Sequence, residues 1–253
     1  MTISIRDWVR FTDKLNKVST RATWDLRDWL IRQGGLDVID RQALIDYAFA
    51  LATKYGEGTG ALAAAWYDAI AEASAKFLPA AEVAPTATYA ETAKTVNGVL
   101  KASQNEETLL GAVERLVKMP GVDTTLRNAI RDGAQVAWIP VGETCAFCIT
   151  LASRGWQRAS RRIVKNGHAE HIHANCNCTY AVRFDSDTQV AGYDPGVYRK
   201  MYDDAEGSSP TAKINAMRRE FYAENRAEIR AQQNAAYEKR IELNSSGAEE
   251  ADV

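Results

Sequence analysis

Apolar side chains recur every three or four positions along the first third of the chain, the spacing of helices with one buried face. The first helix is expected to begin after a capping Ser4 and to stop at Gly34. A second helix should begin after Asp40 and a third should cover Ala61–Phe77. Between them we expect a turn at the glycine-rich segment GEGTG, residues 56–60, because glycine is a poor helix former.

Two prolines indicate a bend or linker near residues 79–88. Beyond it, the apolar spacing predicts helices over Tyr89–Ser103 and Glu106–Lys118. The segment MPGVD should end the second of these, and Asp123 can then cap a further helix that runs to Gln135. The whole region is therefore expected to be helical.

Two β-rich segments follow, at Val136–Pro140 and Thr179–Phe184. If they pair, they bring together the two ends of the stretch between them. Later, Ser209 can cap a helix with proline at its first position, and no breaker follows before about Leu243. The apolar stripe of this helix is thin, so it either lies in solvent along its own domain or packs on neighbouring subunits of an assembly.

The composition is that of an ordinary globular chain. Its 253 residues are 46% hydrophobic and 25% charged, and the net charge of −2 gives no overall basic field for nucleic-acid binding. The first residues lack the pattern of a signal peptide, and the most apolar stretch is too short to span a bilayer. We therefore expect a reducing cytoplasm and no membrane contact, conditions in which clustered cysteines bind metal more often than they form disulfides.

All 4 cysteines and all 3 histidines lie in one window, from Cys145 to Cys178. Four ligands of these types predict a closed, tetrahedral structural zinc site. The expected ligands are Cys145, Cys148, His173 and Cys178. Cys176 is the alternative to Cys178, because we expect at most one of these two cysteines to reach the ion from an extended strand.

Two alternatives for the window stay open. The first is a set of free thiols without metal. The second is a zinc deaminase, because His168 and Glu170 stand in the H-x-E spacing that such enzymes use together with a Cys-x-x-Cys pair. Here the two elements come in the reverse order, and the chain before the pair is nearly all helix. Glu170 is therefore expected to be an ordinary exposed acid, and His168 and His171 to lie at the surface or around the site.

The window also has a local basic character. No acidic residue occurs between Thr144 and Ala169, while the same stretch contains Arg154, Arg158, Arg161, Arg162 and Lys165. Packaged DNA, RNA or an acidic partner surface could contact these residues, so a zinc-dependent nucleic-acid-binding protein is an alternative function. The alternative is a solvated loop whose charges are balanced by its neighbours.

The stretch VGETCAFCITLASRG, followed by HANCNC and TYAVRF, resembles the Mu protein F-like (MuF-like) minor head proteins of tailed phages, in the form found in phages of actinobacteria. The segments RNAIRDGAQVAWIPVGETCAFC and ATKYGEGTGALAAAWYDAI are similar to the same group, so the resemblance covers most of residues 40–185 in patches. The family motif falls on Cys145, Cys148, His173, Cys176 and Cys178.

This resemblance implies a structural virion protein and not an enzyme. Such proteins act in head morphogenesis as minor capsid components near the portal vertex or the inner capsid. The expected partners are the portal and/or major capsid protein in a large assembly, with packaged DNA as a further candidate. The expected location is the virion, preceded by the host cytoplasm during assembly.

Together these observations predict a mainly α (α+β) fold. A helical domain is expected over residues 1–135 and a small zinc-stapled β-hairpin module over residues 136–185. A C-terminal helical arm should cover residues 186–243, and residues 244–253 should form a disordered acidic tail.

Overall fold

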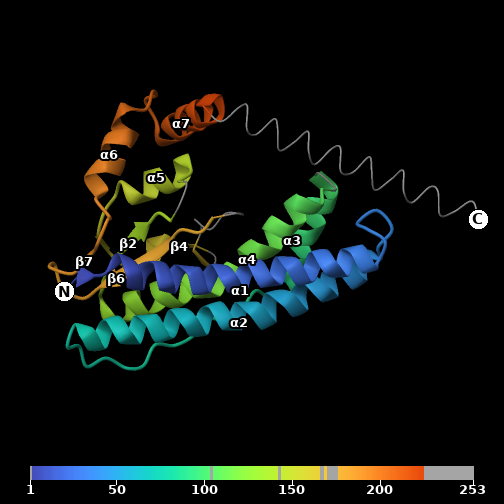
Figure 1. Cartoon of the computed structure of the whole chain (residues 1–253), viewed down its shortest axis with the longest axis horizontal. Helices are drawn as coiled ribbons and strands as arrows, with labels where there is room; N and C mark the ends of the chain where they lie inside the picture. The colour runs from blue at the N-terminus through green and yellow to red at the C-terminus, as the bar shows by residue number, and fades with distance from the viewer. Residues whose placement is uncertain (1, 103–104, 142–143, 166–167, 170–175, 225–253) are drawn as a thin grey trace, which may run out of the picture.

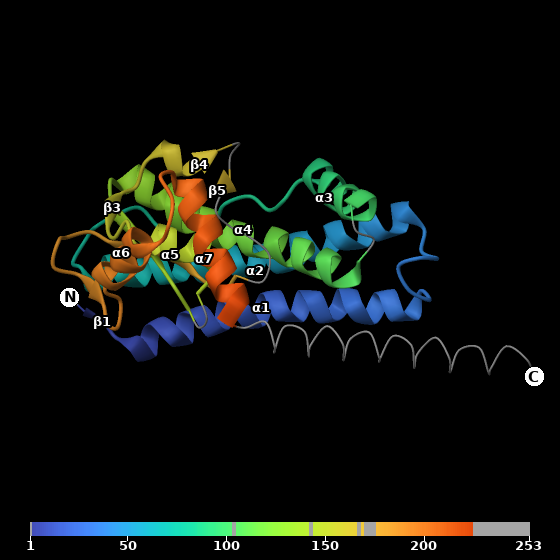
Figure 2. The same ribbon diagram turned by 90° about the horizontal axis from the view of Figure 1, so that it is seen from above.

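The computed structural model describes residues 2–102, 105–141, 144–165, 168–169 and 176–224. The long helices α1 (Ile5–Arg32), α2 (Arg41–Ala73) and α4 (Glu106–Asp132) form one layer, with α3 (Tyr89–Ala102) at one end. A small sheet lies between this layer and a second group of helices, as Figures 1 and 2 show. That group comprises α5 (Ala146–Ala152), α6 (Pro195–Asp204) and α7 (Pro210–Glu224). The mainly α fold with a small β part is confirmed.

The central sheet has the strand order β3-β2-β6, with both pairings antiparallel. Its strands are β2 (Gln135–Ile139), β3 (Gln157–Arg158) and β6 (Thr179–Arg183). The predicted pairing of the two β-rich segments is therefore correct, and Trp138 lies opposite Tyr180. Inside the cysteine window, β4 (Val164–Lys165) and β5 (His168–Ala169) form a short antiparallel pair, preceded by the 3-10 turn η1 (Arg161–Ile163).

The first strand of the chain pairs with one of the last. Residues Thr2–Ile3 form β1, which runs parallel to β7 (Gln189–Val190). Ile3 is buried, and its carbonyl accepts a hydrogen bond from the N–H of Ala191 at 3.0 Å. The N-terminal segment is therefore attached to the region that follows the cysteine window.

Two predicted helix caps are confirmed. The Ser4 hydroxyl accepts a hydrogen bond from the Asp7 N–H at 3.1 Å, and the Asp40 carboxylate accepts one from the Ala43 N–H at 2.8 Å. Trp8 and Phe11 are buried on the inner face of α1 as expected. The end of α1 also lies close to the predicted stop at Gly34.

The predicted turn at GEGTG is wrong, because α2 runs through it without a break. The glycines allow close packing against neighbouring segments. A Cβ atom on Gly56 would lie 3.1 Å from the ring of Pro120, and one on Gly60 would lie 2.6 Å from the Val83 side chain. The predicted helix over Ala61–Phe77 is thus the second half of α2, which ends at Ala73.

The predicted break at MPGVD is also wrong. Helix α4 continues through Pro120, and Asp123 is buried inside it instead of capping a new helix. Proline lacks an N–H to donate to the preceding turn. The Thr59 hydroxyl of α2 donates to the nearby Val117 carbonyl at 2.7 Å, so the two helices are joined at this point. The helix ends at Asp132 and is followed by the capping residue Gly133, which has a φ of 67°.

The predicted bend near residues 79–88 contains no helix or strand and lies along α4. The Glu82 N–H donates to the Asn128 side-chain oxygen, and the Ala84 N–H donates to the Thr124 hydroxyl, each at 2.9 Å. Ala84 and Ala87 are buried. The segment is thus fastened to the helix layer.

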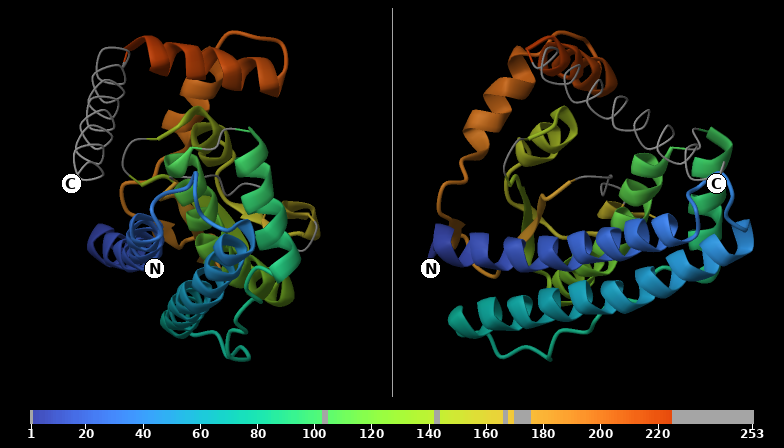
Figure 3. Two further views of the ribbon diagram at one scale, coloured as in Figure 1. Left: turned by 90° about the vertical axis from the view of Figure 1, so that its right-hand side faces the viewer. Right: turned by 45° about the vertical axis from the view of Figure 1, so that its right-hand side comes forward.

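The region predicted as a C-terminal arm begins with β7 and α6 before its main helix. Helix α7 starts as predicted, and the Ser209 hydroxyl accepts a hydrogen bond from the Ala212 N–H at 3.2 Å. Met217 is buried where α7 packs over α5, and Figure 3 shows α6 and α7 above α5 from two further sides. The remainder of the predicted arm, residues 225–243, and the predicted tail, residues 244–253, lie outside the described residues.

One hydrophobic cluster crosses the predicted domain boundary after residue 135. It includes Phe11 of α1, Tyr67 of α2 and Leu126 of α4, together with Trp138 of β2 and Cys148 of α5. The sheet and the cysteines therefore share a core with the long helices. A second cluster joins α1, α2, α3 and α4 at the other end of the layer.

Candidate metal centre

Helix α5 positions the first cysteine pair of the window. Cys145 is its N-cap residue, and the Cys145 carbonyl accepts a hydrogen bond from the Ile149 N–H at 3.0 Å. Cys148 lies within the first turn and is 0% exposed. Its side chain belongs to the hydrophobic cluster that includes Trp138, Cys176 and Cys178, while α6 and α7 pack on α5.

The second cysteine pair lies directly before β6. Cys176 and Cys178 are in a non-strand segment, since β6 begins at Thr179. Pairing between β2 and β6 places this segment beside the end of β2, where the Val141 N–H donates to the Cys178 sulfur at 3.4 Å. Cys176 is 6% exposed and Cys178 is 8% exposed.

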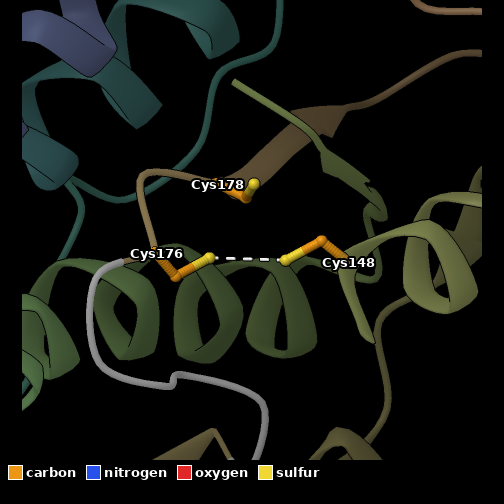
Figure 4. A group of neighbouring side chains, drawn as sticks. All are labelled: Cys148, Cys176 and Cys178. Atoms are coloured by element: carbon orange, nitrogen blue, oxygen red, sulfur yellow. Dashed lines mark hydrogen bonds between the residues drawn. The ribbon is translucent and has the colours of Figure 1, made fainter. Parts of the chain in front are cut away.

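Three sulfur atoms converge at this point. The thiols of Cys148, Cys176 and Cys178 all lie within 4.8 Å of one another. Figure 4 shows Cys148 reaching in from α5 and meeting Cys176, with the two sulfurs 3.3 Å apart, and Cys178 beside them at the start of β6. Segments far apart in the sequence thus deliver their thiols to one buried point.

The surroundings of Cys148 and Cys178 favour the protonated thiol in the absence of a cation. Hydrogen bonding with Cys145, then with Cys176 and Cys178, and burial together raise the pKa of Cys148 far above its usual range. The hydrogen bond with Cys148 lowers the pKa of Cys178, but contact with Cys176 and burial outweigh it and raise that pKa to about 12. A bound cation would have to displace these protons, since thiolates are the metal ligands.

A lysine from α4 holds the segment that carries Cys176 and Cys178. The Lys118 ammonium donates to the Cys176 carbonyl at 2.7 Å and to the Asn177 side-chain oxygen at 3.1 Å. It also forms an ion pair with Glu114 at 2.7 Å, one helical turn earlier. Sequence reasoning missed Lys118. The available signal was its spacing of four residues from Glu114 within an apolar stretch.

The structure brings some of the expected zinc ligands into one cluster. Cys148 and Cys178 lie in the cluster, and Cys176, the expected alternative to Cys178, joins them. The two cysteines precede the strand, so their side chains are not required to point to opposite faces of a sheet. Cys145 contacts Cys148 through its thiol. His173 lies outside the described residues, as do His171 and Glu170, and His168 lies in β5.

The predicted basic residues occupy several elements. Arg154 follows α5, Arg161 and Arg162 lie in η1, and all three are exposed. Lys165 lies in β4.

Arg158 is placed in β3, where its guanidinium lies against the end of α4. A Cβ atom on Gly133 would be 3.3 Å from that guanidinium. A cation at a helix C-terminus is favourable, so Arg158 contributes to the fold.

Comparison with known families places this arrangement in context. A family model described as VG15 protein matches residues 2–205, which include the long helices, the central sheet and the cysteine cluster. Comparison with curated proteins and with solved structures gave no match. Among the described helices, none combines the length and apolar character required to cross a membrane. The chain belongs to the VG15 protein family and is thereby a phage protein.

Proposed function

We propose that the cysteine cluster is a structural zinc site that fastens α5 and the segment before β6 to the helix layer. The observation that supports it is the convergence of the Cys148, Cys176 and Cys178 thiols within 4.8 Å. Sulfur ligands favour zinc over magnesium or calcium, and a closed site with several thiolates is typical of structural zinc.

The surroundings fit a site of this kind. The Val141 N–H donates to the Cys178 sulfur, and such a bond stabilises a thiolate. The Lys118 ammonium, which is hydrogen-bonded to the Cys176 carbonyl, fixes the segment that carries two of the three thiols. A catalytic zinc keeps a position open for water, whereas these thiols are at most 8% exposed. Burial therefore favours a structural role.

A fourth ligand would complete a tetrahedral site. Cys145 is a candidate through its contact with Cys148, and His173 is the candidate from the sequence motif. The experiment measures zinc by mass spectrometry in protein purified without chelator, beside its melting temperature. Cys148→Ser and Cys176→Ser should each lose the bound zinc, expected at about one ion per chain, and should melt earlier.

Matched variants identify the fourth ligand and test the site as a whole. Whichever of Cys145→Ser and His173→Ala reduces the zinc content more identifies that ligand, and His168→Ala serves as the control that retains zinc. Zinc-free wild-type protein, combined with an unchanged melting temperature for Cys148→Ala, would show that the cluster holds free thiols.

We further propose that the protein is a structural component of the phage head, a minor capsid or head-morphogenesis protein of the MuF-like kind. Membership of the VG15 family over residues 2–205 supports a phage role, and the motif resemblance supports the head. In this proposal its partners are the portal and/or major capsid protein and packaged DNA. Its location is the virion, at the capsid interior or the portal vertex.

Mass spectrometry of purified virions tests this proposal. The protein should be found in particles at a few copies relative to the portal, and a nonsense mutant should yield defective heads. Normal particles that lack the protein, measured at a sensitivity that detects the portal, would refute it.

We also propose that the chain is not an enzyme. The Glu170→Gln variant should retain zinc and its melting temperature, and the wild type should not release ammonia from cytidine or adenosine. Zinc-dependent deamination that is lost in Glu170→Gln would establish the deaminase alternative.

A further inference from the structure

A polar pocket of about 350 Å³ lies beside the cysteine cluster, against the central sheet. Its floor includes Val136 of β2 and Leu151 of α5, both buried, and its rim carries Arg154 and Arg162. This volume falls at the lower end of the range for small-ligand pockets. No acidic side chain is among the described residues that line it.

The pocket concentrates hydrogen-bond donors. Arg154 and Arg162 contribute two guanidiniums, and neither makes a side-chain hydrogen bond or ion pair with another described residue. Ser160 adds a hydroxyl at the rim. An anion that entered here would meet positive charge and unused donors together.

Two nearly buried polar side chains line the same pocket. Tyr180 is 6% exposed and Trp138 is 2% exposed. The Trp138 indole N–H is buried, and it has no hydrogen-bond partner within the described part of the chain. Buried polar groups are normally satisfied, so the unpaired N–H of a residue that lines the pocket supports a ligand site here.

The walls of the pocket are held by fixed elements. Trp138 and Tyr180 are paired across β2 and β6, with ring centroids 4.8 Å apart. The Gln157 side chain donates to the Arg154 carbonyl at 3.3 Å, and β3 pairs with β2 at Gln157. The Arg154 guanidinium thus extends from a backbone that is fixed by hydrogen bonding. A fixed backbone lowers the entropic cost of binding a ligand.

We propose that this pocket binds a phosphate group carried by a nucleotide or by a nucleic-acid strand. A phosphate offers more acceptor oxygens and more negative charge than a carboxylate. It can therefore engage both Arg154 and Arg162 together with Ser160 or Tyr180. Of the five basic residues in the window, Arg154 and Arg162 are the two that line the pocket among the described residues, and Arg158 lies against the end of α4. It does not depend on the zinc site.

Calorimetry on the full chain tests the proposal at physiological salt. The probes are inorganic phosphate, thymidine 5′-monophosphate and a short single-stranded DNA, with glutamate as the carboxylate comparison. Arg154→Gln and Arg162→Gln should each weaken binding of the phosphate probes about tenfold, the effect of losing one charge-assisted interaction. Arg199→Gln on α6, another exposed arginine, is the matched control and should bind as the wild type does.

The outcomes separate the phosphate sources. Tight binding of the mononucleotide identifies a free nucleotide as the ligand. Binding of the strand alone, with an affinity that falls steeply as salt rises, identifies nucleic acid. No binding of any probe, an equal loss in Arg199→Gln, or glutamate binding as tight as phosphate would overturn the proposal. Zinc content and virion location are measured separately and are not affected by these results.

Discussion

Lys118 is a charged side chain that links helix packing to the cysteine cluster. Its side chain is only 9% exposed, and that of its partner Glu114 is 13% exposed. The ammonium also donates to the Cys176 carbonyl. Removing one member of a buried pair leaves the other charge without compensation, which is far more costly than losing a surface pair.

We therefore predict that Lys118→Met lowers the free energy of unfolding by about 3 kcal/mol. Urea denaturation of the zinc-loaded protein measures this change. Lys200→Met, which breaks the exposed pair with Asp204, is the control and should change stability little. Similar losses for the two variants would mean that Lys118 has no special role.

Tyr67 and Asp132 provide a second prediction, for the dependence of stability on pH. The Tyr67 hydroxyl donates to the Asp132 carboxylate at 2.8 Å. Burial raises the pKa of Asp132, but hydrogen bonds from Arg131 and Tyr67 outweigh it, and the net pKa is lowered. The resulting stabilisation is present above about pH 4, the ordinary range for aspartate, and is lost as the pH falls through the lowered pKa.

Tyr67→Phe should accordingly reduce the free energy of unfolding by about 1.5 kcal/mol at pH 7. The difference from the wild type should shrink as the pH falls below about 4 and through the lowered pKa of Asp132, where the folded-state carboxylate becomes protonated. Urea titrations at several pH values measure it. A difference that stays constant down to the acid limit of folding would show that the hydrogen bond to the carboxylate does not contribute.

Sequence reasoning reached the cysteine site only in part. The spacing of Cys145 and Cys148 and the position of the window identified the candidate metal ligands. The choice between Cys176 and Cys178 depended on where β6 begins, and strand ends are poorly defined by alternation alone. Lys118 was missed because its contact with Cys176 joins residues 58 positions apart.

At the level of elements, the close contact between α2 and α4 was likewise not predictable from the local sequence. Caps at Ser4 and Asp40 were predictable because capping is a local interaction. The glycines of GEGTG and the Pro120-Gly121 pair were interpreted as breaks, the usual local meaning of these residues. Here they allow close packing against neighbouring segments, a tertiary requirement that overrides helix propensity.

Two glycine substitutions test this explanation. A Cβ atom on Gly121 would lie 3.1 Å from the Thr59 backbone carbonyl, so Gly121→Ala should force the helices apart and cost about 1–2 kcal/mol. A Cβ atom on Gly58 would lie 3.5 Å from Val18, an ordinary contact. Gly58→Ala should therefore stabilise the protein by up to about 1 kcal/mol through helix propensity. Thermal unfolding measures the stability of both variants. Equal changes in stability would contradict close packing at Gly121.

The shared hydrophobic core predicts how the whole molecule unfolds. Phe11, Leu126 and Trp138 belong to one cluster that joins the long helices to the sheet. Helix content by circular dichroism and tryptophan fluorescence should therefore report one coincident transition. Removal of metal should shift both signals together. Two separate transitions would instead show that the region after residue 135 unfolds as an independent module.

The pairing of β1 with β7 has a consequence for synthesis on the ribosome. Thr2–Ile3 emerge before their partner Gln189–Val190, which follows nearly two hundred residues later. Until then, the apolar side chain of Ile3 has no strand to cover it. The helices can form as they emerge, whereas closure of the fold waits for a late segment. We therefore expect nascent chains halted before residue 189 to remain open at β1, so translation through β7 is a condition for closing this strand pair.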